Sequence, residues 1–150
     1  MERNVTTLAK YLLTKGIDSP TKIQKMLFFF RVEELKQNPN PKNSFFSKDK
    51  NFQAWIYGPV NVPSYLVIQE WHNKDIEKEA LLLSDKEMNE IDKQYGAYFE
   101  KYAGESKEWL IDESHKNVAW INARGSLGSD EICKEYLIED ENFIKFRDGN

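Results

Sequence analysis

Apolar residues recur at helical spacing through the first third of the chain. Within residues 5–15 one helix face carries Val5, Leu8, Ala9 and Leu12. Gly16 follows where a C-cap is expected, and Ser19-Pro20 then predicts the start of a second helix, which runs to about Lys36. Its centre, residues 26–30, is apolar on every side. We therefore expect this second helix to be enclosed by the other elements and to form the core.

A strict alternation replaces the helical pattern at residue 52. One side of the expected strand carries Phe52, Ala54 and Ile56, and the other side carries Gln53, Trp55 and Tyr57. Gly58-Pro59 is expected to end this strand, because Gly allows a positive φ and Pro offers no N–H. Asn61 and Pro63 then predict the start of a helix over about 62–72. Residues 42–51 are expected to form a loop or the first strand of a hairpin with this segment.

The second half of the chain contains further helix signals. Ser84-Asp85-Lys86-Glu87 has the form of a capping box and predicts a helix that ends near Gly104. Further helices are expected over about 106–116 and from Ser129 to about Leu137, while residues 142–146 alternate as a strand would. The predicted fold is mainly α, with about six helices and a short β-hairpin, in a single domain of residues 1–150.

The charge is unevenly distributed along the chain. Residues 1–50 contain ten Lys or Arg and five Asp or Glu, whereas residues 51–150 contain eleven and twenty, which gives a net charge of −4. No run of about eighteen apolar residues occurs, so we expect no membrane span. The N-terminal Met1-Glu2-Arg3-Asn4 lacks the apolar core of a signal peptide. The expected location is therefore the cytoplasm.

The candidate chemistry does not indicate an enzyme or a metal site. Cys133 is the single cysteine, and with His72 and His115 as the only histidines the sequence offers neither a disulfide nor a His/Cys zinc cluster. No recognisable motif surrounds Cys133 as a thiol nucleophile, and the loop 125–128 lacks the Lys-Ser/Thr of a P-loop. An enzyme of unfamiliar type would need a pocket that joins His115 to Arg124. We expect no catalytic activity and no cofactor.

The aromatic corner made by Trp55, Tyr57 and Tyr65 has two interpretations. Large aromatic side chains most often bury for packing, which would make the corner a structural hinge. Rigid aromatic side chains also dominate binding hot spots, so the same residues could contact a partner. The sequence leaves both interpretations open.

A DNA-binding role is the alternative from a different functional class. The basic first third carries Lys22, Lys25, Arg31 and Lys36 near the second helix. Two helices joined at residues 16–20 superficially resemble a helix-turn-helix motif. However, the would-be recognition helix is the apolar one, and the net acidic charge opposes tight binding to a phosphate backbone. A nucleic acid is therefore not the expected partner.

Several short motifs, taken in order, resemble the Panacea domain family of SocA-like, phage-associated antitoxins. The most specific is the corner Ala54-Trp55-Ile56-Tyr57-Gly58-Pro59-Val60, followed by Val62-Pro63-Ser64-Tyr65. The other motifs are Thr21-Lys22-Ile23-Gln24-Lys25-Met26-Leu27-Phe28, Leu83-Ser84, Ser114-His115, Ala119-Trp120 and Ala123-Arg124. This chain departs from the family pattern at Ser114, where Thr is usual, at Ala119, where Pro is usual, and in the tail after Leu137. The resemblance extends from about Val5 to Leu137.

The resemblance implies an antitoxin that neutralises a cognate protein toxin by direct binding. The toxin would be encoded next to it, and some relatives instead deliver a toxin to a protease. The motif positions that the resemblance assigns to structure or to partner binding are Gln24, Lys25, Trp55, Tyr57, Gly58, Pro59, Tyr65, His115, Trp120 and Arg124. For His115 we favour a core role in which one ring nitrogen meets a backbone carbonyl. The alternative remains a phage-derived DNA-binding regulator that uses the basic N-terminal third.

Overall fold

The computed structural model describes residues 1–46, 51–125, 127–128, 131 and 136–147. Six α-helices occur in these ranges: α1 (Val5–Thr14), α2 (Pro20–Gln37), α3 (Val62–Asn73), α4 (Asp85–Tyr102), α5 (Lys107–Ser114) and α6 (Val118–Arg124). Two strands, β1 (Phe52–Trp55) and β2 (Gly58–Asn61), form an antiparallel hairpin. Two short 3-10 helices, η1 (Lys78–Leu81) and η2 (Glu141–Ile144), complete the described elements. The prediction of a mainly α fold with a short hairpin is confirmed.

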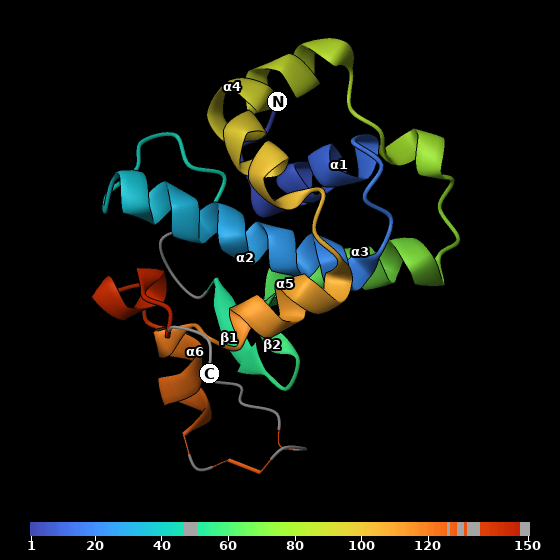
Figure 1. Ribbon diagram of the computed structural model, residues 1–150. Coiled ribbons are helices and arrows are strands. Elements are labelled where there is room, and N and C mark those ends of the chain that lie inside the picture. The colour runs from blue at the N-terminus through green and yellow to red at the C-terminus, as the bar shows by residue number, and fades with distance from the viewer. Residues whose placement is uncertain (47–50, 126, 129–130, 132–135, 148–150) are drawn as a thin grey trace.

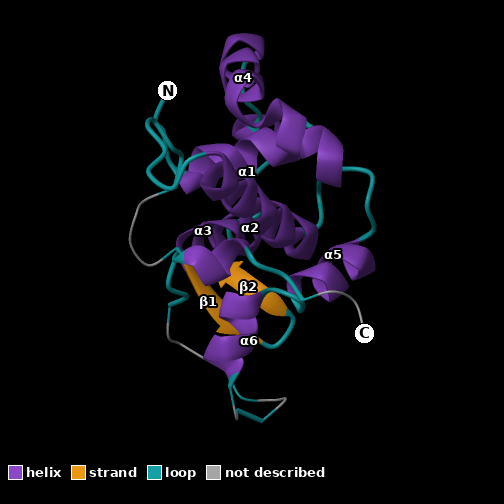
Figure 2. Cartoon of the chain, turned by 60° about the vertical axis from the view of Figure 1, so that its left-hand side comes forward, coloured by secondary structure: helices purple, strands orange, loops and turns teal. Residues whose placement is uncertain are grey.

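Helix α2 lies at the centre of the fold. It contacts β2, α1, α3, α4, α5 and η2, and Figures 1 and 2 place α1 and α4 on one side of it and the hairpin and α6 on the other. The expected enclosure is confirmed, because all thirteen residues from Ile23 to Leu35 are buried. No helix in the described ranges is long and apolar enough to cross a membrane.

Aromatic packing joins the hairpin, the C-terminal segment and α4 to α2. The ring of Phe28 lies 5.6 Å from that of Phe52 in β1 and 5.3 Å from that of Phe143 in η2. On the other side of α2, Phe30 stacks on Tyr95 of α4 at 5.7 Å. Such ring pairs add to the stability that burial alone provides. The core is therefore continuous from α4 through α2 to the hairpin.

The hairpin turn lies two residues earlier than predicted. The first strand ends before the turn at Ile56-Tyr57, and Gly58-Pro59 lies after this turn. Gly58–Asn61 is the second strand of the hairpin, so residues 42–51 do not supply a hairpin strand. Hydrogen-bonded and non-hydrogen-bonded pairs alternate along an antiparallel ladder. Because Pro59 has no N–H, the pair Ala54–Pro59 is the non-hydrogen-bonded one, and a proline there costs no ladder bond.

The C-terminal segment also differs from the prediction. Residues 141–144 form η2 in place of a strand, because the Asp140 side chain accepts a hydrogen bond from the Asn142 N–H at 2.9 Å and caps a tight turn. Only Phe146 adds a bridge, to Asn117. The predicted helix from Ser129 lies mainly outside the described residues, and its expected end is wrong, since Tyr136 pairs with Gln53 as an isolated β-bridge. The sixth described α-helix is α6, over residues 118–124, and not the predicted helix from Ser129.

Candidate functional site

The ten motif residues, which are spread over a hundred positions of sequence, converge on the hairpin. Gln24 and Lys25 approach β2 from α2, and Tyr65 packs on β1 from α3. The C-terminal half supplies His115, Trp120 and Arg124 beneath the same hairpin. The remaining four residues, Trp55, Tyr57, Gly58 and Pro59, belong to the hairpin itself. The structure thus brings all of them into one region.

Side chains from both halves of the chain hold the hairpin carbonyls. Lys25 Nζ donates to the Pro59 carbonyl at 2.8 Å, and an Arg124 guanidinium N–H donates to the Ala54 carbonyl at 3.1 Å. These are the two carbonyls of the non-hydrogen-bonded pair, which point away from the ladder. Trp120 Nε1 donates to the Trp55 carbonyl at 2.9 Å. The hairpin is therefore fixed by side chains that approach from both its edges.

Gln24 links the hairpin to α3 through a buried polar cluster. Its Oε1 accepts from the Asn61 N–H at 2.8 Å, and its Nε2 donates to Ser64 Oγ at 2.9 Å. Asn61 in turn caps α3, since its side chain accepts from the Ser64 N–H at 2.9 Å. The predicted capping role of Asn61 is confirmed. The Asn61 side chain also donates to the Asn51 carbonyl at 2.9 Å, and Ser64 Oγ donates to the Asn61 carbonyl at 3.1 Å, so this cluster has a structural role.

Gly58 occupies a position that a side chain would disrupt. Its φ is +115°, a backbone conformation that glycine allows and other residues rarely adopt. A β-carbon built on Gly58 would collide with Ser114 Oγ and would lie 3.1 Å from Lys25 Nζ. The absence of a side chain lets α2 and the end of α5 approach the turn from two directions.

His115 lies beneath the turn with one buried, unsatisfied nitrogen. Its ring stacks on that of Trp120 at 4.4 Å with an interplanar angle of 6°. Its Nε2 has no hydrogen-bond partner among the residues that the structure describes. Burial, and then the positive charge of Lys25, lower the pKa of His115, while Asp112 and the backbone of residues 56–57 act in the opposite direction. The net effect favours the neutral imidazole.

The three aromatic residues of the corner divide between packing and exposure. The rings of Trp55 and Tyr65 pack edge to face at 4.9 Å, and both side chains are half-buried. Tyr57, in the turn, is 70% exposed, and Leu66, on the first turns of α3, is 60% exposed. Both interpretations offered by the sequence therefore apply, each to different residues: Trp55 and Tyr65 pack, and Tyr57 projects.

A cavity of about 350 Å³ opens between the hairpin, α2 and α3. Its apolar wall consists of Pro20, Trp55, Ile56, Tyr57, Val60 and Tyr65. Thr21, Gln24, Lys25 and Gln69 provide the polar part of the lining. A mainly apolar pocket of this size with a few converging polar groups is typical of small-molecule sites.

Lys25 is the charged group of this cavity, and it is 1% exposed. Nζ donates to the Pro59 carbonyl, and in the described part of the chain no carboxylate forms an ion pair with it. Burial lowers the pKa of Lys25 to about 7. Burial therefore favours the neutral form of this amine more than it does for an exposed lysine.

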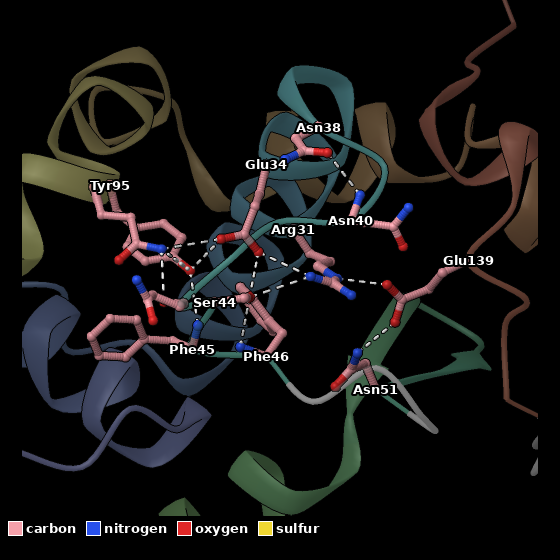
Figure 3. A network of polar contacts seen from close by, with 12 residues as sticks. Arg31, Glu34, Asn38, Asn40, Ser44, Phe45, Phe46, Asn51, Tyr95 and Glu139 are labelled. Carbon is pink, nitrogen blue, oxygen red and sulfur yellow. Dashed lines mark hydrogen bonds and ion pairs between the residues drawn. The ribbon is translucent and has the colours of Figure 1, made fainter.

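The other buried charges of α2 are all paired. Figure 3 shows Arg31 between Glu34, at 3.0 Å, and Glu139, at 2.5 Å, with Tyr95 donating to Glu34 at 2.6 Å. Farther along, Glu33 accepts from Lys101 at 2.8 Å and from Tyr102 at 2.7 Å. The pattern of hydrophobic residues missed this network, since charged residues are normally expected at the surface. The available signal was the three charged residues Arg31, Glu33 and Glu34, which directly follow the all-apolar segment of the same helix.

The structure also bears on the DNA-binding alternative and on the idea of a pocket that joins His115 to Arg124. Of the four basic residues that the DNA-binding alternative would use, Lys25 and Arg31 are buried and cannot reach a phosphate backbone. His115 and Arg124 both contact the hairpin region, but Arg124 is engaged by the backbone carbonyls of Ala54, Gly128 and Glu131. Cys133 lies outside the described residues.

Comparison of this chain with known protein families, with curated proteins and with solved structures finds no match.

Proposed function

We propose that this protein is an antitoxin that neutralises a cognate protein toxin by direct binding, with the toxin encoded next to it. The observation that supports this best is Tyr57, an aromatic side chain that is 70% exposed at the end of a braced hairpin. A rigid, exposed aromatic loses little entropy on binding, which is why such residues act as interface anchors. The motif resemblance supplies the class of partner.

The contact surface of this proposal is the hairpin turn together with the start of α3. Leu66 is 60% exposed and lies next in sequence to Tyr65, whose ring packs on Trp55 of the hairpin. The two exposed apolar side chains, Tyr57 and Leu66, therefore belong to two elements that are packed against each other. A toxin that covers both would remove them from water.

A growth assay tests the proposal. The neighbouring reading frame is induced in a heterologous host with and without this protein, and copurification then tests direct binding. Toxicity that this protein relieves, together with copurification of the pair, is the expected result. A harmless neighbour, or a toxic one that this protein fails to rescue, would contradict the antitoxin role.

A pair of variants locates the contact surface. Tyr57→Ala is expected to weaken rescue and copurification, because the anchor is removed while the packed hairpin remains. Leu82→Ala is the matched control, since Leu82 is also exposed, at 42%, and lies in the segment before α4. Toxin abundance is measured alongside: a stable, bound toxin indicates neutralisation by binding, whereas a falling toxin level indicates delivery to a protease.

The DNA-binding alternative makes a distinct prediction. Binding through phosphates would weaken steeply as salt rises. A protein that binds only protein should show no such salt-dependent DNA binding, and the burial of Lys25 and Arg31 favours this outcome.

A further inference from the structure

Among the residues that the structure describes, Lys25 is the one buried charge of α2 without an ionic partner. Arg31 pairs with Glu34 and Glu139, and Glu33 pairs with Lys101. Within the described residues, Lys25 has one neutral acceptor, the Pro59 carbonyl, for the three N–H groups of its ammonium form. Burying a charge without a counter-charge is costly, so this arrangement is electrostatically incomplete.

The surroundings of Lys25 increase the preference for an anion. The same cavity wall contains Pro20, Thr21 and Gln24, which form the first turns of α2. The N-terminus of an 18-residue helix carries a partial positive charge.

The opposite wall of the cavity is apolar. Trp55 and Tyr65 meet edge to face at 4.9 Å, and Ile56 and Val60 continue the same surface. An anion alone would leave this surface in contact with water. A ligand that also carries an aromatic or branched apolar group would cover it and gain the free energy of burial.

We propose that this cavity binds a small organic carboxylate with an aromatic or branched apolar body, with its carboxylate against Lys25 and the first turn of α2. The body lies between Trp55, Val60 and Tyr65. This site goes beyond the proposed function, because it needs no toxin and is tested on the isolated protein.

Phenylacetate and phenylacetamide are suitable probes, since they share the ring and differ in charge. Calorimetric titration is expected to show phenylacetate binding about tenfold or more tightly than the amide, as a charge-assisted hydrogen bond would give. In an NMR titration the indole resonance of Trp55 should shift, and that of Trp109, which does not line the cavity, should not. Equal affinity for the two probes, or no saturable binding of either, would overturn the proposal.

Three variants assign the preference to the cavity. Lys25→Met should abolish the preference for phenylacetate, while Lys93→Met, which removes an exposed lysine of α4, should leave it unchanged. Thr21→Glu is a second test that does not depend on Lys25, because acidic residues are favourable in a first helical turn and the fold should tolerate it. This variant should weaken phenylacetate binding and leave phenylacetamide binding unaffected. A preference that survives both Lys25→Met and Thr21→Glu would place the probe elsewhere and overturn the site.

Discussion

The Nζ atom of Lys25 lies 2.8 Å from the carbonyl oxygen of Pro59 and connects the buried centre of α2 to the second strand of the hairpin. The carbonyl is free for this contact because Pro59 belongs to a non-hydrogen-bonded pair of the ladder. Gly58, the preceding residue, lets the lysine approach because it has no side chain. A buried amine and a tight turn therefore depend on each other.

Replacing Lys25 should change how stability depends on pH. Burial lowers the pKa of Lys25 from 10.5 to about 7. Between these values the unfolded chain binds a proton that the folded protein does not, so stability falls as the pH decreases from 10.5 to 7 and the full penalty applies below 7. At pH 7, removing the buried charge in Lys25→Met should raise the free energy of unfolding by about 1–4 kcal/mol. The lost hydrogen bond should reduce this gain by about 1 kcal/mol.

Urea unfolding of Lys25→Met and the wild type at pH 7, 8.5 and 10 checks this prediction. The advantage of the variant should shrink as the pH rises toward 10. An advantage that is constant over this range would mean that Lys25 keeps an ordinary pKa in the folded protein.

A side chain at position 58 should destabilise the protein through two effects. Gly58→Val places a β-carbon at positive φ and forces it against Ser114 and Lys25, with an expected cost of about 1–3 kcal/mol or more in the free energy of unfolding. Gly16→Val is the matched control, because Gly16 has φ +97° and nothing within 4 Å of its β-carbon. Thermal and urea unfolding should show a larger loss at Gly58. Equal losses would show that the close contact of Gly58 with Ser114 and Lys25 does not add to the cost of the substitution in the free energy of unfolding.

The imidazole of His115 should titrate below its ordinary range. Burial and the nearby positive charge of Lys25 both lower its pKa from 6.5. An NMR pH titration of the His115 ring protons should therefore give a midpoint below 6.5, and Lys25→Met should raise that midpoint by removing one of the two causes. A midpoint at or above 6.5 in the wild type would contradict the buried, neutral state.

The pair formed by Glu33 and Lys101 offers a second pH test, in the acid range. Hydrogen bonds from Lys101 and Tyr102 outweigh the effect of burial and lower the pKa of Glu33 below 4.5. Its stabilising effect is therefore present above pH 4.5 and is lost as the pH falls through the folded pKa. Glu33→Gln should cost about 1.5–3 kcal/mol at pH 7, and the cost should decline in acid. Glu90→Gln, an exposed change on α4, should be close to neutral throughout.

Local patterns were sufficient to predict five of the six described helices, α1 to α5, but not α6. The capping box at Ser84 and Glu87 is present as predicted, and Ser19 and Asn61 cap α2 and α3 as expected. These signals act between residues three or four apart, so they do not depend on the rest of the fold. The same reasoning misplaced the turn and the C-terminal strand. The turn position depends on which strand pairs with which, and Asp140 caps a short turn that alternation does not reveal.

The sequence by itself determined that α2 is enclosed, that Gly58 is free to take a positive φ and that the corner is aromatic, because burial periodicity and backbone sterics are local properties. Only the tertiary structure decided that Tyr57 projects while Trp55 and Tyr65 pack, since the exposure of the corner depends on how α3 packs against the hairpin. It also decided that Arg31 and Glu33 have ionic partners from distant parts of the chain, while Lys25 has none among the described residues. Pairing between residues a hundred positions apart has no local signature, because it is set by which elements α2 contacts.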